Sequence, residues 1–172
     1  KCSFKNKSCL FNLCGHTPYT LVQYIKQFNP KEDELNSIIM QVHTALYTIH
    51  NLAYMSHGDM HWNNILIYYP MPKMQSIIYE IQGIKYLVPV KCLVVLSDFG
   101  KSTLHLDLSQ SNISNYSIKK NTINNFQNNI YSSAIRSMNN DFLQFLQFQS
   151  YWKSYKLPNK PPIRIVNFCK KY

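Results

Sequence analysis

The stretch that decides the fold reads HGDMHWNNILI at residues 57–67. It places one carboxylate, Asp59, shortly before an amide, Asn64, and an apolar run follows directly. A second stretch, LSDFG at residues 96–100, sets another aspartate, Asp98, behind another apolar run. Either stretch alone is a common accident. Both together, in this order and each beside an apolar strand, predict a single shared site.

The two stretches resemble the catalytic loop and the metal-binding loop of protein kinases. Phosphoryl transfer needs a carboxylate that orients the attacking hydroxyl and accepts its proton, and it needs oxygen ligands for Mg²⁺. The resemblance implies that Asp59 is the catalytic base and that Asn64 and Asp98 hold Mg²⁺ and, through it, ATP. The short interval between Asp59 and Asn64 suits a tight loop that presents both side chains to one cleft.

The long segment between Asn64 and Asp98 narrows the resemblance. Ordinary protein kinases join these loops by a short hairpin, whereas residues 76–88 predict an additional hairpin here. This insertion, with His61-Trp62 after the aspartate, is similar to haspin-type kinases and their relatives in large DNA viruses. The resemblance covers residues 17–155. It implies an α+β fold, a mainly helical kinase C-terminal lobe with a β-hairpin inserted between the catalytic loop and DFG.

The resemblance also implies how the catalytic loop is held in place and how its activity is regulated. The resemblance implies that Asp141 is a buried aspartate that braces the catalytic loop from a central helix. Haspin itself has Tyr and Thr where this chain has Phe99-Gly100, and no Ala-Pro-Glu triplet follows. Gly58 replaces an Arg that in many kinases pairs with a phosphate on the activation segment. We therefore expect activity that does not depend on phosphorylation of the Ser- and Asn-rich residues 109–140.

The kinase features of an N-terminal lobe are not recognisable in the sequence. The four glycines cannot form a glycine-rich phosphate loop, and no strand carries the lysine that such a lobe contributes. The first residue is Lys1 rather than Met, which favours a longer product. We therefore expect residues 1–172 to be a partial kinase domain without its N-terminal lobe, weak or inactive by itself.

The implied function is transfer of phosphate from ATP to Ser or Thr of a protein substrate, a basic or chromatin-associated protein being one option. Two alternatives stay open. A small-molecule kinase of the aminoglycoside or choline phosphotransferase type also shows HGD with a histidine two residues later. A non-catalytic kinase fragment would act as a binding module. The DFG triplet and the inserted hairpin favour the protein kinase, and the intact Asp59, Asn64 and Asp98 argue against a remnant.

Composition limits the partners and the compartment. With 45% hydrophobic residues in 172, the chain is globular and large enough for one core. The net charge of +10 comes from scattered lysines, so we do not expect a nucleic-acid partner. No secretory signal, disulfide spacing or membrane-length apolar run is present, which favours the cytoplasm or nucleus, including that of a virus-infected cell. The spacing of Cys2, Cys9, Cys14 and His16 is not that of structural zinc.

Apolar spacing predicts the elements around the two loops. A long helix over residues 31–52 should form the core, and Thr17-Pro18 should start a shorter helix before it. Another buried helix is predicted at residues 141–155, followed by an extended, proline-containing tail. Predicted strands lie at residues 65–69, 76–81, 84–88 and 92–96.

Overall fold

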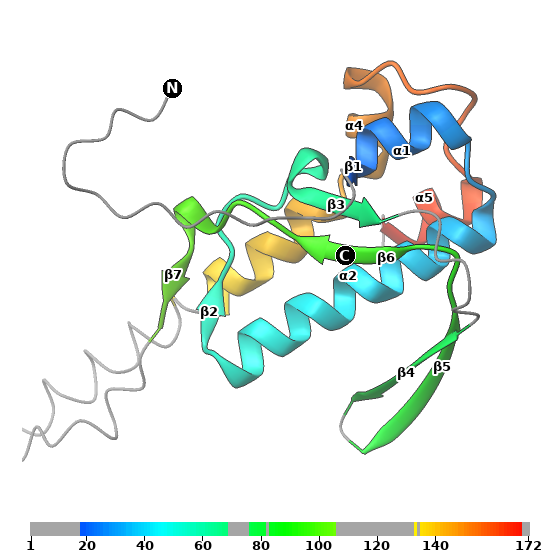
Figure 1. The fold of residues 1–172 in the computed structure, drawn as a ribbon. Coiled ribbons are helices and arrows are strands. Elements are labelled where there is room, and N and C mark those ends of the chain that lie inside the picture. The colour runs from blue at the N-terminus through cyan, green and yellow to red at the C-terminus, as the bar shows by residue number, and fades with distance from the viewer. Residues whose placement is uncertain (1–17, 69–75, 82, 106–132, 134, 170–172) are drawn as a thin grey trace, which may run out of the picture.

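The computed structural model describes residues 18–68, 76–81, 83–105, 133 and 135–169, and within them the fold is mixed α+β (Figure 1). The helices are α1 (Leu21–Phe28), α2 (Glu32–Leu52), α4 (Phe148–Ser154) and α5 (Ile163–Cys169), with a further helical segment at residues 135–145. The strands are β1 (Tyr19–Thr20), β2 (Met55–Ser56), β3 (Ile65–Tyr68), β4 (Ser76–Ile81), β5 (Ile84–Pro89), β6 (Leu93–Leu96) and β7 (Thr103–Leu104). Short 3-10 helices lie at η1 (Trp62–Asn64) and η2 (Phe99–Lys101).

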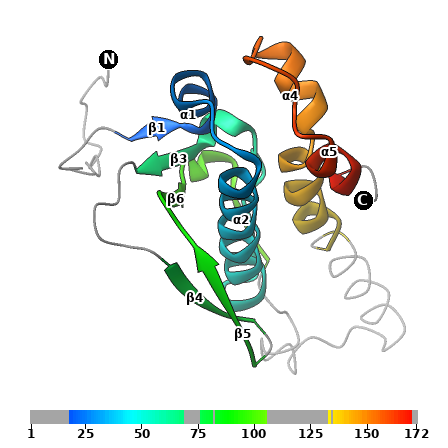
Figure 2. The same cartoon turned by 90° about the vertical axis from the view of Figure 1, so that its right-hand side faces the viewer.

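Helix α2 is the centre of this arrangement. Figure 2 shows it between strands β1, β3 and β6 on one side and the segment 135–145 with α4 and α5 on the other. The side chains that recur at helical spacing along it are at most 1% exposed: Leu35, Ile38, Val42 and Leu46. Acidic side chains fill its first turn, at the positive end of the helix dipole. The helix predicted over residues 31–52 is therefore confirmed as the core element.

The start of α1 differs from the prediction. Thr20, not Thr17-Pro18, caps the helix: its hydroxyl accepts a hydrogen bond from Gln23 N, and the Gln23 side chain accepts one from Thr20 N. This reciprocal pair is a capping box and satisfies two backbone donors at once. Thr17 lies outside the described residues. Asn29 ends α1 as a left-handed C-cap at φ 44°.

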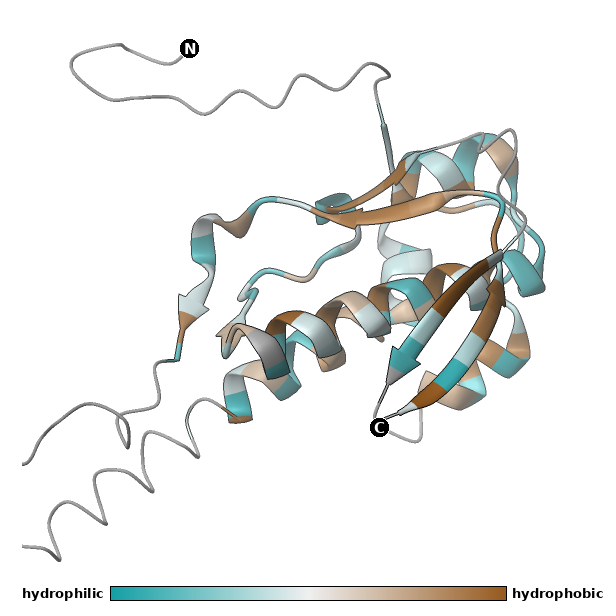
Figure 3. Ribbon diagram, turned by 60° about the horizontal axis from the view of Figure 1, so that its bottom comes forward, coloured by the Kyte–Doolittle hydropathy of each residue, from teal (hydrophilic) through white to brown (hydrophobic). Residues whose placement is uncertain are grey.

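Three small antiparallel sheets carry the strands. β3 lies between β1 and β6, and Ile65 pairs with Leu96, so residues just before β3 and just after β6 share one edge of the sheet. In Figure 3 the two strands above α2 are apolar along most of their length, as expected for a covered strand pair. β4 and β5 form the separate inserted hairpin, with Ser76 opposite Pro89. The predicted strands are confirmed to within one residue at each described end, while Tyr69 lies outside the described residues.

The C-terminal part departs most from the prediction. The single helix predicted at 141–155 is two: helical residues begin before Asp141, the helix breaks at residues 146–147, and α4 begins at Phe148. The predicted extended tail contains α5, because Pro162 precedes the first turn, where a missing N–H costs nothing, and its carbonyl accepts from Val166 N. Of the Ser- and Asn-rich residues 109–140, residues 135–140 are helical and most of the rest lies outside the described residues.

The length and hydropathy of the helices in the described residues decide whether one of them could cross a membrane. None of their helices combines the length and the apolar character that crossing a bilayer requires. Residues 1–16, with the cysteines and the histidine considered for zinc, lie outside the part of the chain that the structure describes.

Candidate active site

Asp141 holds the backbone of the HGD triplet in place. Its side chain is almost fully buried, and its two carboxylate oxygens accept from His57 N at 2.7 Å and from Gly58 N at 2.8 Å. His50 Nε2 of α2 lies 3.0 Å from the same carboxylate. Burial raises the pKa of Asp141, but the hydrogen bonds from His50, His57 and Gly58 outweigh it and hold the pKa below its usual value. The contact predicted for Asp141 is confirmed.

His57 ties the loop of residues 57–64, named the catalytic loop for its resemblance to that of kinases, to the loop of residues 98–101, named the metal loop on the same ground. Its ring is fully buried, and Nε2 lies 2.9 Å from the carbonyl oxygen of Ser97, directly before Asp98. Since a carbonyl only accepts, Nε2 carries a proton, and the lone pair of Nδ1 accepts from Asp59 N at 3.3 Å. The His57 ring also packs on Phe99, with centroids 4.7 Å apart. One imidazole therefore bonds to the backbone of Asp59 and to that of Ser97, the neighbour of Asp98, and links the two loops.

The rest of the catalytic loop is anchored by packing and by two further hydrogen bonds. Met60 and Trp62 are fully buried in the main core. Trp62 Nε1 donates to the carbonyl of Phe145, and Met60 N donates to the side chain of Gln144. Both acceptors lie on the helical segment that carries Asp141. Of the His61-Trp62 pair noted in the sequence, Trp62 therefore anchors the loop in the core.

Gly58 is required where the two loops touch. Its φ is +79°, and a Cβ added there would lie 2.4 Å from the backbone oxygen of Lys101. Real Cβ atoms do not approach a backbone atom so closely, and the left-handed φ strains any other residue. In this conformation Gly58 cannot be replaced by the Arg that many kinases carry in the motif that this stretch resembles. The sequence showed the missing Arg but not the backbone contact that excludes it.

Two side-chain nitrogens lie near one carboxylate oxygen of Asp59, those of Lys101 and His61. The Asp59 side chain is 15% exposed, and its Oδ2 lies 2.8 Å from Lys101 Nζ and 3.8 Å from His61 Nε2. The hydrogen bond from Lys101 lowers the pKa of Asp59, which is therefore ionised at neutral pH. Among the described residues no hydrogen bond reaches Oδ1 of Asp59. That oxygen is free to accept from a substrate hydroxyl.

Asn64 and Asp98 occupy the same sheet edge. The Ile65–Leu96 pairing places both residues there, and the backbone oxygen of Asn64 accepts from Ser97 N at 2.9 Å. Asn64 is buried, and its Nδ2 donates to the carbonyl of Asp59 at 2.9 Å, which leaves the amide oxygen as a ligand atom. Asp98 is exposed and lies in the left-handed region at φ 60°, and its side chain accepts a long 3.4 Å hydrogen bond from Gly100 N.

The donor set at this edge suits Mg²⁺. Among the described residues no cluster of three or more His, Cys, Asp or Glu side chains could hold a metal by itself. The edge offers one carboxylate, from Asp98, and one amide oxygen, from Asn64. Mg²⁺ is commonly held by one or two such oxygens, with water and substrate phosphates completing its octahedron. The residues present therefore fit a metal that arrives with a nucleotide.

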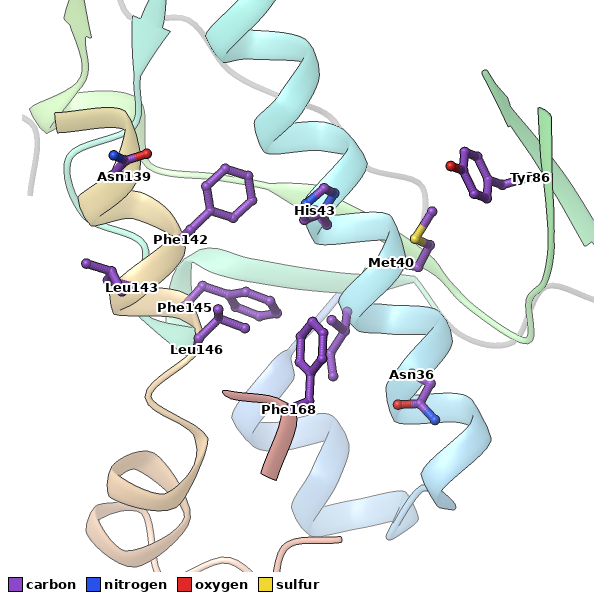
Figure 4. Close-up of a pocket in the computed structure, with 11 residues that line it drawn as sticks. Asn36, Met40, His43, Tyr86, Asn139, Phe142, Leu143, Phe145, Leu146 and Phe168 are labelled. Atoms are coloured by element: carbon purple, nitrogen blue, oxygen red, sulfur yellow. The ribbon is translucent and has the colours of Figure 1, made fainter. Parts of the chain in front are cut away.

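A large apolar cavity lies apart from these residues. It has a volume of about 710 Å³ and opens between α2, the segment 135–145 and α5 (Figure 4). Met40, His43, Phe142 and Phe168 are among the side chains that line it, and no carboxylate of the described residues does. Burial lowers the pKa of His43, so this imidazole is neutral at neutral pH. The described lining of the cavity is thus mainly apolar.

Comparison with known proteins adds no relative to this picture. Searches against protein-family models, curated proteins and solved structures return no match for this chain. A function must therefore be argued from the site's own residues. Of these, Asp59, Asn64 and Asp98 were predicted from the sequence, whereas Lys101 was not, because a single lysine after a turn has no diagnostic spacing.

Proposed function

We propose that this chain is the catalytic C-terminal lobe of a Ser/Thr protein kinase, which transfers the γ-phosphoryl group of ATP to a protein hydroxyl in the presence of Mg²⁺. The observation that carries the proposal is the set of bonds around His57. Asp141 fixes its backbone, and its imidazole bridges Asp59 N and Ser97 O. This arrangement holds a free carboxylate oxygen beside an edge that carries a carboxylate and an amide.

Asp59 acts on the acceptor hydroxyl. Its ionised Oδ1 accepts a hydrogen bond from the hydroxyl and orients the oxygen toward the γ-phosphorus. The oxygen–phosphorus bond forms as the bond to the β,γ-bridging oxygen breaks, ADP leaves, and the hydroxyl proton passes to Asp59. Because the pKa of Asp59 is lowered, its main contribution is orientation, with proton acceptance late in the transfer.

Asn64 and Asp98 act on the nucleotide. Bound Mg²⁺ would neutralise charge on the β- and γ-phosphate oxygens. Asp98 supplies the full negative charge that attracts the metal, whereas Asn64 supplies a dipole. The bond from Asn64 Nδ2 to the carbonyl of Asp59 couples the metal ligand to the catalytic loop. Nucleotide and hydroxyl are thereby placed in one geometry.

The proposal is tested by transfer from γ-labelled ATP, with the full-length gene product as enzyme. Three acceptor sets are compared: a basic protein such as histone, an aminoglycoside, and choline. We expect Mg²⁺-dependent label on Ser or Thr of the protein and none on the small molecules. Label on a small molecule instead would replace the protein kinase by a small-molecule kinase. No transfer to any acceptor and no binding of Mg-ATP would leave a binding module.

A further inference from the structure

The catalytic loop has no permanent cation of its own. Residues 57–64 contain no Lys or Arg, and His61 lies 3.8 Å from Asp59, beyond a hydrogen bond. The charge that faces Asp59 comes from the metal loop, where Lys101 ends η2 and donates to Oδ2 at 2.8 Å. Among the described residues, Lys101 is the cation whose side chain bonds directly to Asp59, the proposed base.

The backbone of Lys101 is seated before any ligand binds. Its carbonyl packs against Gly58, a contact that only glycine allows. On its other side Ser102 Oγ donates to the carbonyl of His57 at 3.1 Å, and β7 then pairs with β2. The chain around Lys101 is thus fixed to the catalytic loop at successive points. Only the side chain is free to move, and it is 69% exposed.

The ammonium group of Lys101 lies near the proposed places of both reactants, the acceptor hydroxyl and the nucleotide. It bonds to Asp59, where the acceptor hydroxyl would lie, and it is attracted by Asp98, where the metal and phosphates would lie. In an in-line transfer the γ-phosphoryl group passes between these two places, carrying negative charge on three oxygens. A seated cation there needs only a small rotation of its side chain to reach those oxygens.

Building on the proposed function, we propose that Lys101 is a catalytic residue that contacts the γ-phosphoryl group during transfer, the metal loop supplying the cation that the catalytic loop lacks. The ammonium group leaves Oδ2 of Asp59 for a γ-phosphate oxygen when ATP binds. It stays protonated throughout: the hydroxyl proton goes to Asp59, the bridging bond breaks, and ADP carries away the electron pair. Lys101 neutralises charge on the transferring group.

The test compares Lys101→Ala and Lys101→Arg with Lys91→Ala. Lys91 is a matched control, because its side chain is also 69% exposed and pairs with a carboxylate, Glu34, away from the site. Affinities for Mg-ATP and for Mg-ADP are measured by calorimetry, and kcat by transfer to the protein acceptor. For Lys101→Ala we expect kcat to fall roughly 10- to 100-fold and Mg-ATP affinity to fall about fivefold, with Mg-ADP affinity unchanged. Lys101→Arg should recover most of both losses.

The outcomes separate this inference from the proposed function. If the parent transfers phosphate and Asp59→Asn abolishes transfer, while Lys101→Ala behaves as Lys91→Ala does, the role of Lys101 is refuted and the kinase stands. A faster Lys101→Ala variant also refutes it and makes the Lys101–Asp59 bond inhibitory. If the parent neither binds Mg-ATP nor transfers phosphate, the proposed function falls and the role of Lys101 falls with it.

Discussion

The catalytic loop and the metal loop lie side by side, yet they are built in opposite ways. In residues 57–64 the side chains of His57, Met60 and Trp62 are fully buried and hydrogen bonds tie the loop to a helix. In residues 98–101 the side chains are exposed, Phe99 at 41% and Lys101 at 69%. The loop with the proposed base is therefore held by the fold, whereas the loop with the proposed metal ligand Asp98 is open to solvent.

The largest effect on stability is expected at the anchor of the buried loop. Asp141→Asn leaves one acceptor oxygen for two backbone N–H groups, so at least one buried donor loses its partner. We expect the free energy of unfolding to fall by about 2–4 kcal/mol, and kcat to fall with it. Chemical denaturation measures the change, with Asp33→Asn, exposed in the first turn of α2, as the control.

The pH dependence of the same variant gives the sign of the effect. The pKa of Asp141 is lowered in the folded state, so its carboxylate stabilises the fold above the unfolded-state pKa of about 3.9. That contribution disappears as pH falls through the lower, folded-state pKa. The stability difference between the parent and Asp141→Asn should therefore be constant near neutral pH and shrink in acid. A difference that grows in acid would contradict the assignment.

A smaller loss is expected where the two loops meet. Gly58→Ala and Gly83→Ala both put an L-residue at a left-handed φ, +79° and +78°, so both incur the same backbone strain. Only at Gly58 does the new Cβ meet a backbone oxygen; at Gly83 nothing lies within 4 Å. We expect Gly58→Ala to destabilise by about 1–3 kcal/mol more than Gly83→Ala, and to lower kcat. Equal losses would show that the loops separate easily.

The exposed side should behave differently. Asp98→Ala removes an exposed carboxylate with one long intraloop bond, so the free energy of unfolding should change by less than about 0.5 kcal/mol. Mg-ATP affinity should nevertheless fall, because the charge that faces the metal is gone. Titration of the variant with Mg-ATP, at fixed Mg²⁺, checks this. Unchanged affinity would make Asp98 a turn residue only.

The smallest effect is expected from phosphorylation of residues 109–140. Gly58 leaves no room for a phosphate-binding Arg. Ser102 and β7 already fix residues 102–104 to the catalytic loop and to β2, so no phosphate is needed to hold residues 102–104 in place. Initial rates before and after phosphatase treatment should agree within error. Loss of most activity would mean that another basic group has taken the place of the missing Arg.

The sequence predicted the buried half better than the exposed half. Helix α2 and strand β3 followed from apolar periodicity, and the contact of Asp141 followed from the resemblance to protein kinases. Lys101 could not be predicted, since its role depends on the backbone approach to Gly58, which no spacing encodes. The prediction of an extended tail was wrong. Prolines favour an extended chain in isolation, whereas here Trp152 Nε1 donates to the carbonyls of Pro158 and Asn159 and turns the chain toward α5.

The most direct measurement of the central claim is the turnover of Asp59→Asn beside its affinity for Mg-ATP. The substitution removes proton acceptance and the charge that orients the hydroxyl, but no proposed metal ligand. We predict that kcat falls by roughly 10²- to 10⁴-fold while the Kd for Mg-ATP stays within about twofold. Equal turnover in Asp59→Asn and in the parent would contradict the account, because the oxygen held free at this site would then have no part in the chemistry.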